Sequence, residues 1–142
     1  MSDRAVRGHP VWDEIAPEIT PHEFRNPYEM SVDALRRLSR VRRASKVPFR
    51  FVSDYRAPSY NEQVGGASGS AHTARPCHAV DLRVQNSYER FQIVKHALAA
   101  GYRRIGIYPP TDWQRQQYGK NSGSVHLDDS QYHPQDVIWV SV

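Results

Sequence analysis

The chain has 142 residues, a length that suits one compact domain, and we expect a single domain over residues 1–142. Hydrophobic residues make up 39% of it and charged residues 24%, close to ordinary globular usage, which argues against general disorder. No stretch approaches the roughly 20 apolar residues that cross a bilayer, and the first residues lack the apolar core of a secretory signal. We therefore expect no membrane partner. The single cysteine, Cys77, excludes an internal disulfide.

The formal net charge of +4 favours acidic partners, such as nucleic acid or an anionic polymer of the cell envelope. Much of this charge falls in one arginine-rich segment that contains Arg36, Arg37, Arg40, Arg42 and Arg43. The segment is either a nucleic-acid stripe or the solvated face of a surface helix, and we favour the solvated face. We expect a monomer with no stable nucleic-acid partner.

Residues 1–30 contain four prolines among scattered apolar side chains, so we expect a wrapping N-terminal arm with short helical turns. A helix is expected over residues 31–45, because Ser31 offers an N-cap and Asp33 suits the first turn. Its apolar face consists of Val32, Leu35, Leu38 and Val41. This face should pack on a sheet.

Residues 49–55 are aromatic and β-branched, which predicts a strand, and the Gly, Ser and Asn-rich residues 56–70 predict an active-site loop. A second strand is expected over residues 79–84, where apolar and polar side chains alternate. In this strand Asp81 should face away from the core.

A second helix should begin at Asn86 or Ser87 and end before Gly101. Its buried stripe is predicted to consist of Phe91, Val94 and Leu98. Further strands are expected over residues 104–108, 124–128 and 137–142. This order of elements predicts an α+β domain in which helices cover one face of a mostly antiparallel sheet and leave the other face free for a cleft.

Potential metal ligands gather in two segments. His72, His78 and Asp81 surround the loop that leads into the strand at 79–84, and His126 shares one strand face with Asp128. A catalytic zinc takes three protein ligands from His and carboxylates and leaves one position to water, whose pKa falls to about 7. His72, Asp81 and His126 could supply that set, although a lone histidine is more often a surface or hydrogen-bonded residue.

The pattern resembles that of a known family, the zinc D-alanyl-D-alanine carboxypeptidases and related murein endopeptidases of bacteria and phages, whose metal fold is shared with the hedgehog signalling domain. That family has Ser-x-His, then Ala-x-Asp, then a third His on a strand, which is similar to Ser70, His72, Ala79, Asp81 and His126. Its arginine at the end of an earlier strand is matched by Arg56. The resemblance covers roughly residues 20–142 and implies a zinc cofactor, Zn, held by His72, Asp81 and His126.

Two departures from the family pattern concern the chemistry. The loop from His72 to Asp81 is longer than in the family, with Pro76 and Cys77 where a glycine normally stands. The carboxylate that many relatives carry shortly before the third ligand is replaced here by glycine and serine, in the stretch Gly123-Ser124. The identity of the general base is therefore open.

Asp128 is the leading candidate for that base, because it lies about 7 Å along the strand from His126 and points to the same face. The alternative is that Asp128 only orients a ligand through a hydrogen bond, which is an equally common arrangement. Glu62 and Asp112, both in predicted loops, are the reserves.

The resemblance implies that Arg56 binds the substrate carbonyl or a terminal carboxylate, for which a guanidinium is well shaped. Ser70 either binds substrate or shapes its own loop. His78 is a rival metal ligand, but its odd offset from Asp81 would place the two on opposite strand faces. Cys77 is interpreted as structural.

Among the aromatic residues, Trp113 and Tyr118 are candidates for the cleft, whereas Trp139, in an alternating strand, is interpreted as a packing residue.

The sequence is thus interpreted as a zinc peptidase that hydrolyses a peptide bond of the murein stem peptide, as a D,D-carboxypeptidase or an endopeptidase. A basic chain without a secretory signal suits a protein that stays cytoplasmic until lysis releases it, or a phage-associated enzyme such as an endolysin, acting on the cell wall. Two alternatives stay open: a non-catalytic zinc-bearing module that binds murein, and a basic nucleic-acid-binding domain.

Overall fold

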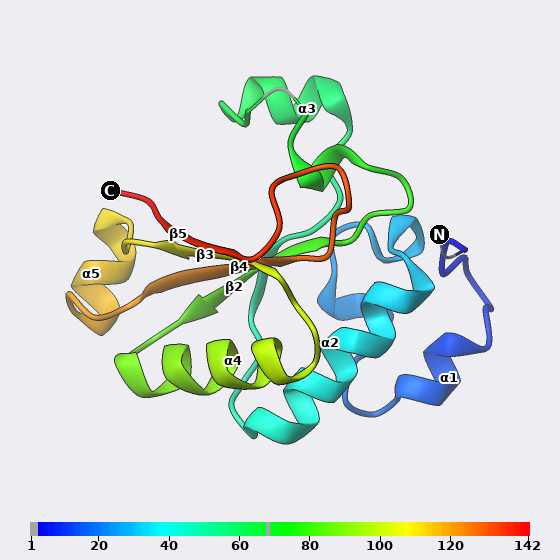
Figure 1. Cartoon of the computed structure of the whole chain (residues 1–142), viewed down its shortest axis with the longest axis horizontal. Helices are drawn as coiled ribbons and strands as arrows, with labels where there is room; N and C mark the ends of the chain where they lie inside the picture. Colours follow the sequence, from blue (N-terminus) through cyan, green and yellow to red (C-terminus); the bar gives the residue numbers. More distant parts are fainter. Residues whose placement is uncertain (1–2, 68) are drawn as a thin grey trace.

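The computed structural model describes residues 3–67 and 69–142. A five-stranded sheet forms one layer, and two long helices, α2 (Val32–Ser45) and α4 (Ser87–Ala99), cover one of its faces (Figure 1). The strands are β1 (Phe51–Ser53), β2 (Ala79–Val84), β3 (Arg104–Tyr108), β4 (Gly123–Asp128) and β5 (Val137–Val140). Their order across the sheet is β1-β2-β4-β3-β5. The α+β class is as predicted.

The sheet is mixed, which corrects the expectation of a mostly antiparallel sheet. Strands β1, β2, β4 and β3 pair antiparallel, but β5 runs parallel to β3. Both edges of β4 are already paired, with β2 and β3, and β5 joins the sheet at the free edge of β3. Because the chain turns back after β4, β5 then points the same way as β3.

Helix α2 forms where its sequence signals place it. The Ser31 hydroxyl accepts a hydrogen bond from the backbone N–H of Ala34, so it caps the helix as expected. Leu35, Leu38 and Val41 are almost fully buried against the sheet and the neighbouring helices. Lys46 ends the helix in the left-handed conformation, with a φ of 57°.

Helix α4 is also capped as expected, since the Asn86 side chain accepts from the backbone N–H of Glu89. Its predicted buried stripe is wrong at two of its three positions: Phe91 is 61% exposed and Leu98 is 50% exposed, whereas Val94 is partly buried against the core. Ile93 and Ala97 are the fully buried residues instead. Helix α4 carries two apolar stripes, and only packing against α2 and the sheet decides which one is buried.

The N-terminal segment lies against α2 through apolar and charged contacts. It contains α1 (Val11–Ile15) and two short 3₁₀ turns, and Ile15 and Ile19 are buried in the core. Arginines of α2 form ion pairs with glutamates of this N-terminal segment, namely Arg36 with Glu14, Arg42 with Glu23 and Arg43 with Glu18. These arginines are therefore partly neutralised within the chain.

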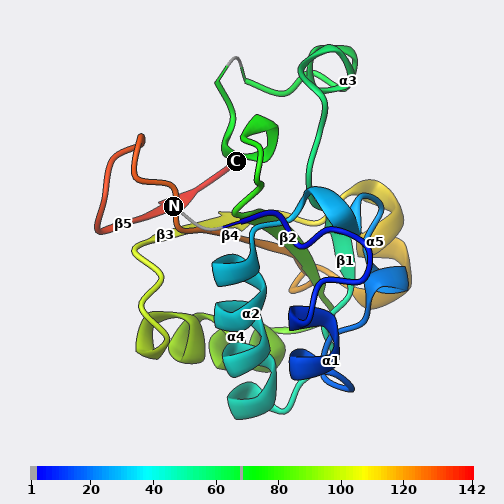
Figure 2. The same cartoon turned by 90° about the vertical axis from the view of Figure 1, so that its right-hand side faces the viewer.

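Two short helices occur where the sequence predicted loops. Helix α3 (Pro58–Gln63) and the 3₁₀ turn at Ala71–Thr73 lie on the side of the sheet opposite α2 and α4 (Figures 1 and 2). Helix α5 (Asp112–Tyr118) follows β3 and precedes β4 in the chain, and it lies at one end of the sheet (Figure 1). Thr111 caps it. The face of the sheet away from α2 and α4 is therefore bordered by short elements and loops.

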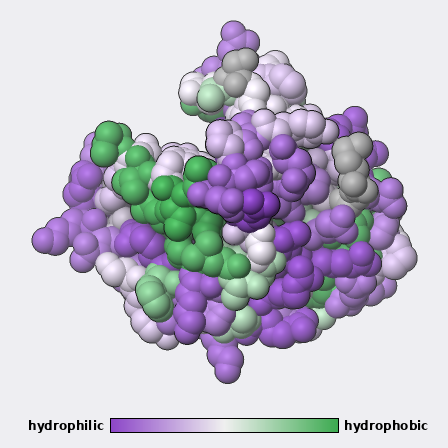
Figure 3. Space-filling model, viewed as in Figure 1, coloured by the Kyte–Doolittle hydropathy of each residue, from purple (hydrophilic) through white to green (hydrophobic). Residues whose placement is uncertain are grey.

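The outer edge strand β5 carries a hydrophobic patch that is visible in Figure 3 near the C-terminus. Ile138, Val140 and Val142 are more than half exposed there. Within the described ranges, no helix is long and apolar enough to cross a membrane.

Candidate metal centre

Two neighbouring strands present the central pair of the site. Asp81 on β2 is directly opposite His126 on β4, and both side chains line the same cavity. Their neighbours Val80, Leu82, Val125 and Leu127 point the other way and are buried in the core. The alternation predicted for both strands therefore positions a carboxylate and an imidazole side by side.

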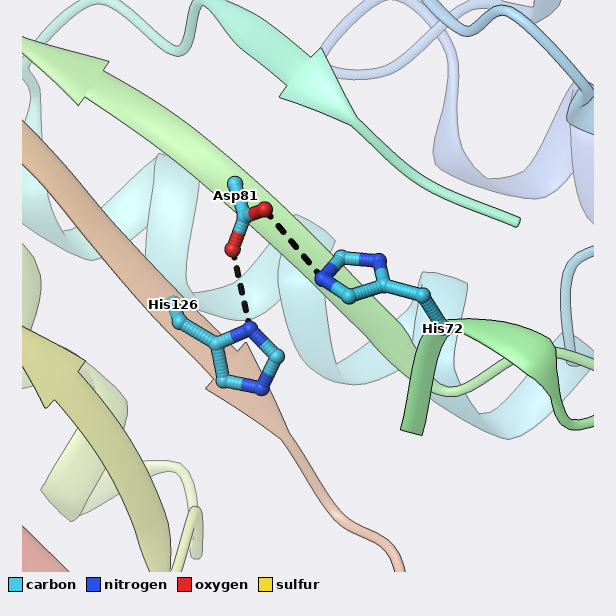
Figure 4. Close-up of side chains that lie close together, drawn as sticks. All are labelled: His72, Asp81 and His126. Carbon is cyan, nitrogen blue, oxygen red and sulfur yellow. Dashed lines mark hydrogen bonds and ion pairs between the residues drawn. The ribbon is translucent and has the colours of Figure 1, made fainter. Parts of the chain in front are cut away.

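The third side chain comes from the loop before β2. His72 lies in the 3₁₀ turn Ala71–Thr73 and points toward Asp81 (Figure 4). Its Nε2 atom is 3.2 Å from Asp81 Oδ2, and Nδ1 of His126 is 2.9 Å from Asp81 Oδ1. One ligand atom from each of the three residues lies within 4.8 Å of the others. The longer loop between His72 and Asp81 does not prevent them from converging.

Hydrogen bonds outside the cluster fix how the two imidazoles face it. His72 Nδ1–H donates to the backbone carbonyl of Asp54 over 2.7 Å, so Nε2 is the ring atom that faces Asp81. His126 Nε2 is 2.6 Å from Asp128 Oδ2, so its Nδ1 is the atom that faces the cluster. Metal-ligating histidines commonly hold their second nitrogen in this way. The donor set and its supports therefore fit a zinc ion.

Without a metal, the three side chains stabilise one another electrostatically. Burial alone would lower the pKa of His126, but hydrogen bonds with Asp128 and Asp81 outweigh it and raise this pKa to about 9. Burial would raise the pKa of Asp81, but hydrogen bonds with His126 and His72 hold it well below its usual range. In the metal-free protein, Asp81 is thus a carboxylate beside a protonated His126.

Asp128 has its oxygens engaged by three partners. The side chain is fully buried, and its Oδ1 accepts from Arg104 Nε over 2.7 Å and from the Ser130 backbone N–H over 3.0 Å. Its Oδ2 contacts His126. This arrangement favours the orienting role over the role of general base, which requires an oxygen free to meet a reacting proton.

The cluster opens into a cavity of 470 Å³ on the open face of the sheet. Arg56 lines it, with Nη2 3.7 Å from Asp81 Oδ2, and its guanidinium is fixed by Ser53 Oγ and Asn61 Oδ1. Ser70 also lines the cavity, but its hydroxyl accepts from the backbone N–H of His72. Ser70 therefore shapes the turn that presents His72.

Several predicted candidates lie elsewhere. His78 Nδ1 contacts Asp129 and is not part of the cluster. Cys77 is fully buried, and burial raises the pKa of its thiol to about 12, which agrees with a structural role. Glu62 and Asp112 are exposed and do not line the cavity.

The aromatic predictions are reversed. Trp113 lines a different hollow, beside α5, and Tyr118 packs edge-on against it. Trp139, expected to be a packing residue, lines the metal-site cavity, with its ring centroid 5.3 Å from that of His126. Its indole N–H donates to the Tyr108 hydroxyl over 3.0 Å. The pairing of β5 with β3 brings Trp139 here, and that pairing was not evident from the sequence.

The sequence interpretation also missed His133, which follows β4 in the loop before β5. Its Nε2 is 2.9 Å from the Gly69 carbonyl and its Nδ1 is 2.8 Å from Ser130 Oγ. His133 therefore joins the loop after β4 to the glycine-rich loop on the other side of the cavity. Only its position after the His126 strand could have suggested a place near the site.

The fold and this donor set define a candidate catalytic metal centre of the kind found in metallopeptidases. The family model described as Peptidase M15 matches residues 15–115, and the chain belongs to this family. M15 peptidases are zinc-dependent, which agrees with the His-Asp-His cluster. The match includes Arg56, His72 and Asp81 and ends before His126, which the structure places beside Asp81 as the sequence predicted. No curated protein and no solved structure matches the chain.

Proposed function

We propose that this protein is a zinc peptidase that hydrolyses a peptide bond in the stem peptide of murein. The observation that carries the proposal is the convergence of His72, Asp81 and His126, with Arg56 at the edge of the same open cavity. Membership of the peptidase M15 family supports the peptidase part. The murein part rests on the resemblance of the site pattern and on the positive net charge of the chain.

His72, Asp81 and His126 would hold the zinc ion. When bound, zinc supplies an activated water at neutral pH and polarises a carbonyl oxygen. The guanidinium of Arg56, fixed by Ser53 and Asn61, is placed to stabilise negative charge that develops on the substrate. Because its geometry is set before substrate arrives, little reorganisation is needed during the reaction.

Asp128 is proposed to position His126 rather than to carry a proton to or from the substrate. Its contact with His126 Nε2 selects the tautomer in which Nδ1 is a ligand, and Arg104 keeps Asp128 ionised and fixed. Such outer hydrogen bonds tune both the affinity of a metal and the orientation of its ligands. We keep the role of general base as the competing hypothesis for this residue.

The stem peptide is an acidic polymer fragment, which suits a cavity whose lining includes the guanidinium of Arg56. The cavity is open to solvent along the sheet, so both trimming of a terminal residue and internal cleavage are compatible with it. We propose that the protein acts on the cell wall after lysis releases it or as part of a phage particle.

Metal content and turnover of point variants test the proposal. His72→Ala and Asp81→Ala should each lose bound zinc and the release of murein fragments. His22→Ala, on an exposed turn outside the cavity, is the matched control and should retain both. A His72→Ala or Asp81→Ala variant that kept zinc and activity would remove the assignment.

One observation favours a second function, that of a zinc-bearing module that binds murein without cutting it. The carboxylates that line the cavity in the described ranges are Asp81 and Asp128, and both are engaged by neighbouring side chains. Retention of murein by the zinc-loaded protein, with no fragment released, would establish this function instead of the peptidase.

A further inference from the structure

The open face of the sheet continues beyond the metal centre in an ordered row. Asp81, His126 and Gly106 are opposite one another on β2, β4 and β3. The next row lies two residues further along these strands and consists of Arg83, Ser124 and Tyr108, which are paired in the same register. Because strand residues alternate in direction, this second row lies on the same face, about 7 Å from the first.

Arg83 in this second row is held rigidly by aromatic rings. Its guanidinium carbon lies 5.6 Å from the ring centroid of Trp113 and 5.5 Å from that of Tyr118, both on α5. The two rings pack edge-on, with centroids 5.8 Å apart. Cation–π contacts of this kind fix the direction of a guanidinium without neutralising its charge.

Arg83 also lacks an anionic partner in the described part of the chain. Its Nε atom is buried and forms no hydrogen bond there, and no described carboxylate lies within ion-pair distance of it. By contrast, the neighbouring Arg50 pairs with Glu89 over 3.0 Å, and Arg115 pairs with Asp112 over 3.2 Å. A half-buried, fixed cation without a counter-ion is suited to bind an anion from outside.

A hollow in front of Arg83 gives such an anion access. Its cavity of 590 Å³ is lined by Arg83, Ser124, Trp113 and the prolines that follow β3, Pro109 and Pro110. Tyr108 lines both this hollow and the metal-site cavity, so the two adjoin along the sheet. Trp113 is 52% exposed, which leaves part of its ring free to contact a ligand.

We propose that Arg83, with Trp113 beside it, forms a substrate subsite that binds a carboxylate located about two residues from the scissile bond. An extended peptide rises about 3.3 Å per residue, so two residues span the roughly 7 Å between the rows. This inference rests on the proposed function for the nature of the substrate, an acidic peptide. The binding of a carboxylate at Arg83 can be measured independently of cleavage.

A matched pair of peptides tests the subsite. One is a synthetic murein stem pentapeptide with the α-carboxylate of its D-glutamate free, and the other is identical except that this carboxylate is amidated. Both are titrated against the zinc-loaded protein while tryptophan fluorescence is recorded, and kcat and KM are then measured for each. The wild type should bind the acidic peptide about tenfold more tightly, as expected for one charge-assisted contact.

Arg83→Gln should remove this preference by raising KM for the acidic peptide about tenfold with kcat unchanged, and should leave the amidated peptide unaffected. Arg115→Gln is the control, because it removes the same charge from an exposed position on α5 outside the hollow. The ratio of kcat/KM for the two peptides is taken within one preparation. It therefore does not depend on the fraction of the variant that folds.

An equal preference of the wild type and Arg83→Gln for the acidic peptide would overturn the subsite while leaving the peptidase intact. Equal binding of the two peptides by the wild type would also overturn it. If the wild type cleaves neither peptide, the proposed function fails, and the fluorescence titration alone decides the subsite. A preference that disappears in Arg83→Gln would then still support it.

Discussion

Replacement of Asp128 by asparagine separates the two roles that this residue could have. The variant keeps the shape of the side chain and one acceptor oxygen, but it removes the charge that faces Arg104 and His126. If Asp128 positions His126, the tautomer with a free Nδ1 is no longer enforced. Zinc affinity should then fall about 10- to 100-fold, the usual effect of removing such a support.

The same substitution should destabilise the metal-free protein. Arg104 is only 8% exposed and would be left as a buried cation without its partner, which costs about 3 kcal/mol or more. The control is Asp136→Asn, because Asp136 pairs with Arg103, the chain neighbour of Arg104, in an exposed position. That control should unfold in denaturant almost as the wild type does.

Zinc affinity is measured by competition with a chelator, and stability by urea unfolding of the metal-free proteins. Turnover is then measured at saturating zinc. Asp128→Asn with unchanged zinc affinity and stability but abolished turnover would refute the positioning role. It would establish Asp128 as the general base.

Four further outcomes follow from the structure. Because folding raises the pKa of His126 to about 9, protonation of His126 should stabilise the metal-free protein by at most about 3 kcal/mol below about pH 6.5. Unfolding measured at several pH values should show this stabilisation disappear as the pH rises toward 9. Zinc affinity should change in the opposite direction, rising with pH, because the proton on His126 competes with the metal. Gly106→Ala would place a methyl group 2.6 Å from the Trp139 ring, so a cost of about 1–3 kcal/mol and a shift in tryptophan fluorescence are expected. Ile93→Ala should cost about 2–5 kcal/mol in urea unfolding, whereas Phe91→Ser should change stability by less than about 0.5 kcal/mol.

For three of these outcomes, the contradicting result is as follows. Stability that is flat between pH 6.5 and 9 would contradict the ion pair between His126 and its two carboxylates. Tolerance of Gly106→Ala without a spectral change would contradict the close approach of Trp139 to β3. Equal costs at Phe91 and Ile93 would show that the stripe predicted from the sequence is buried after all.

Local patterns were sufficient to predict the elements that carry the cluster. The alternation in Ala79–Val84 and around His126 fixed which way Asp81 and His126 point, and their bounds agree closely with β2 and β4. The cap at Ser31 likewise located the start of α2. These signals are contained within a few neighbouring residues, so they can be interpreted without knowledge of the tertiary structure.

The missed features depend on contacts between distant parts of the chain. The pairing of β5 with β3 moves Trp139 into the site, and only the packing of α4 selects Ile93 over Phe91. Arg104 is another example, because its ion pair with Asp128 depends on the pairing of β3 with β4, which places the two residues opposite each other. A single sequence specifies such contacts only through the complete fold.

Mass spectrometry of purified murein incubated with the zinc-loaded protein tests the central claim most directly. We expect stem-peptide fragments with a newly formed carboxyl terminus, which should disappear when a chelator removes the metal and return when zinc is restored. Intact murein after incubation with folded protein that contains one zinc per chain would contradict the claim.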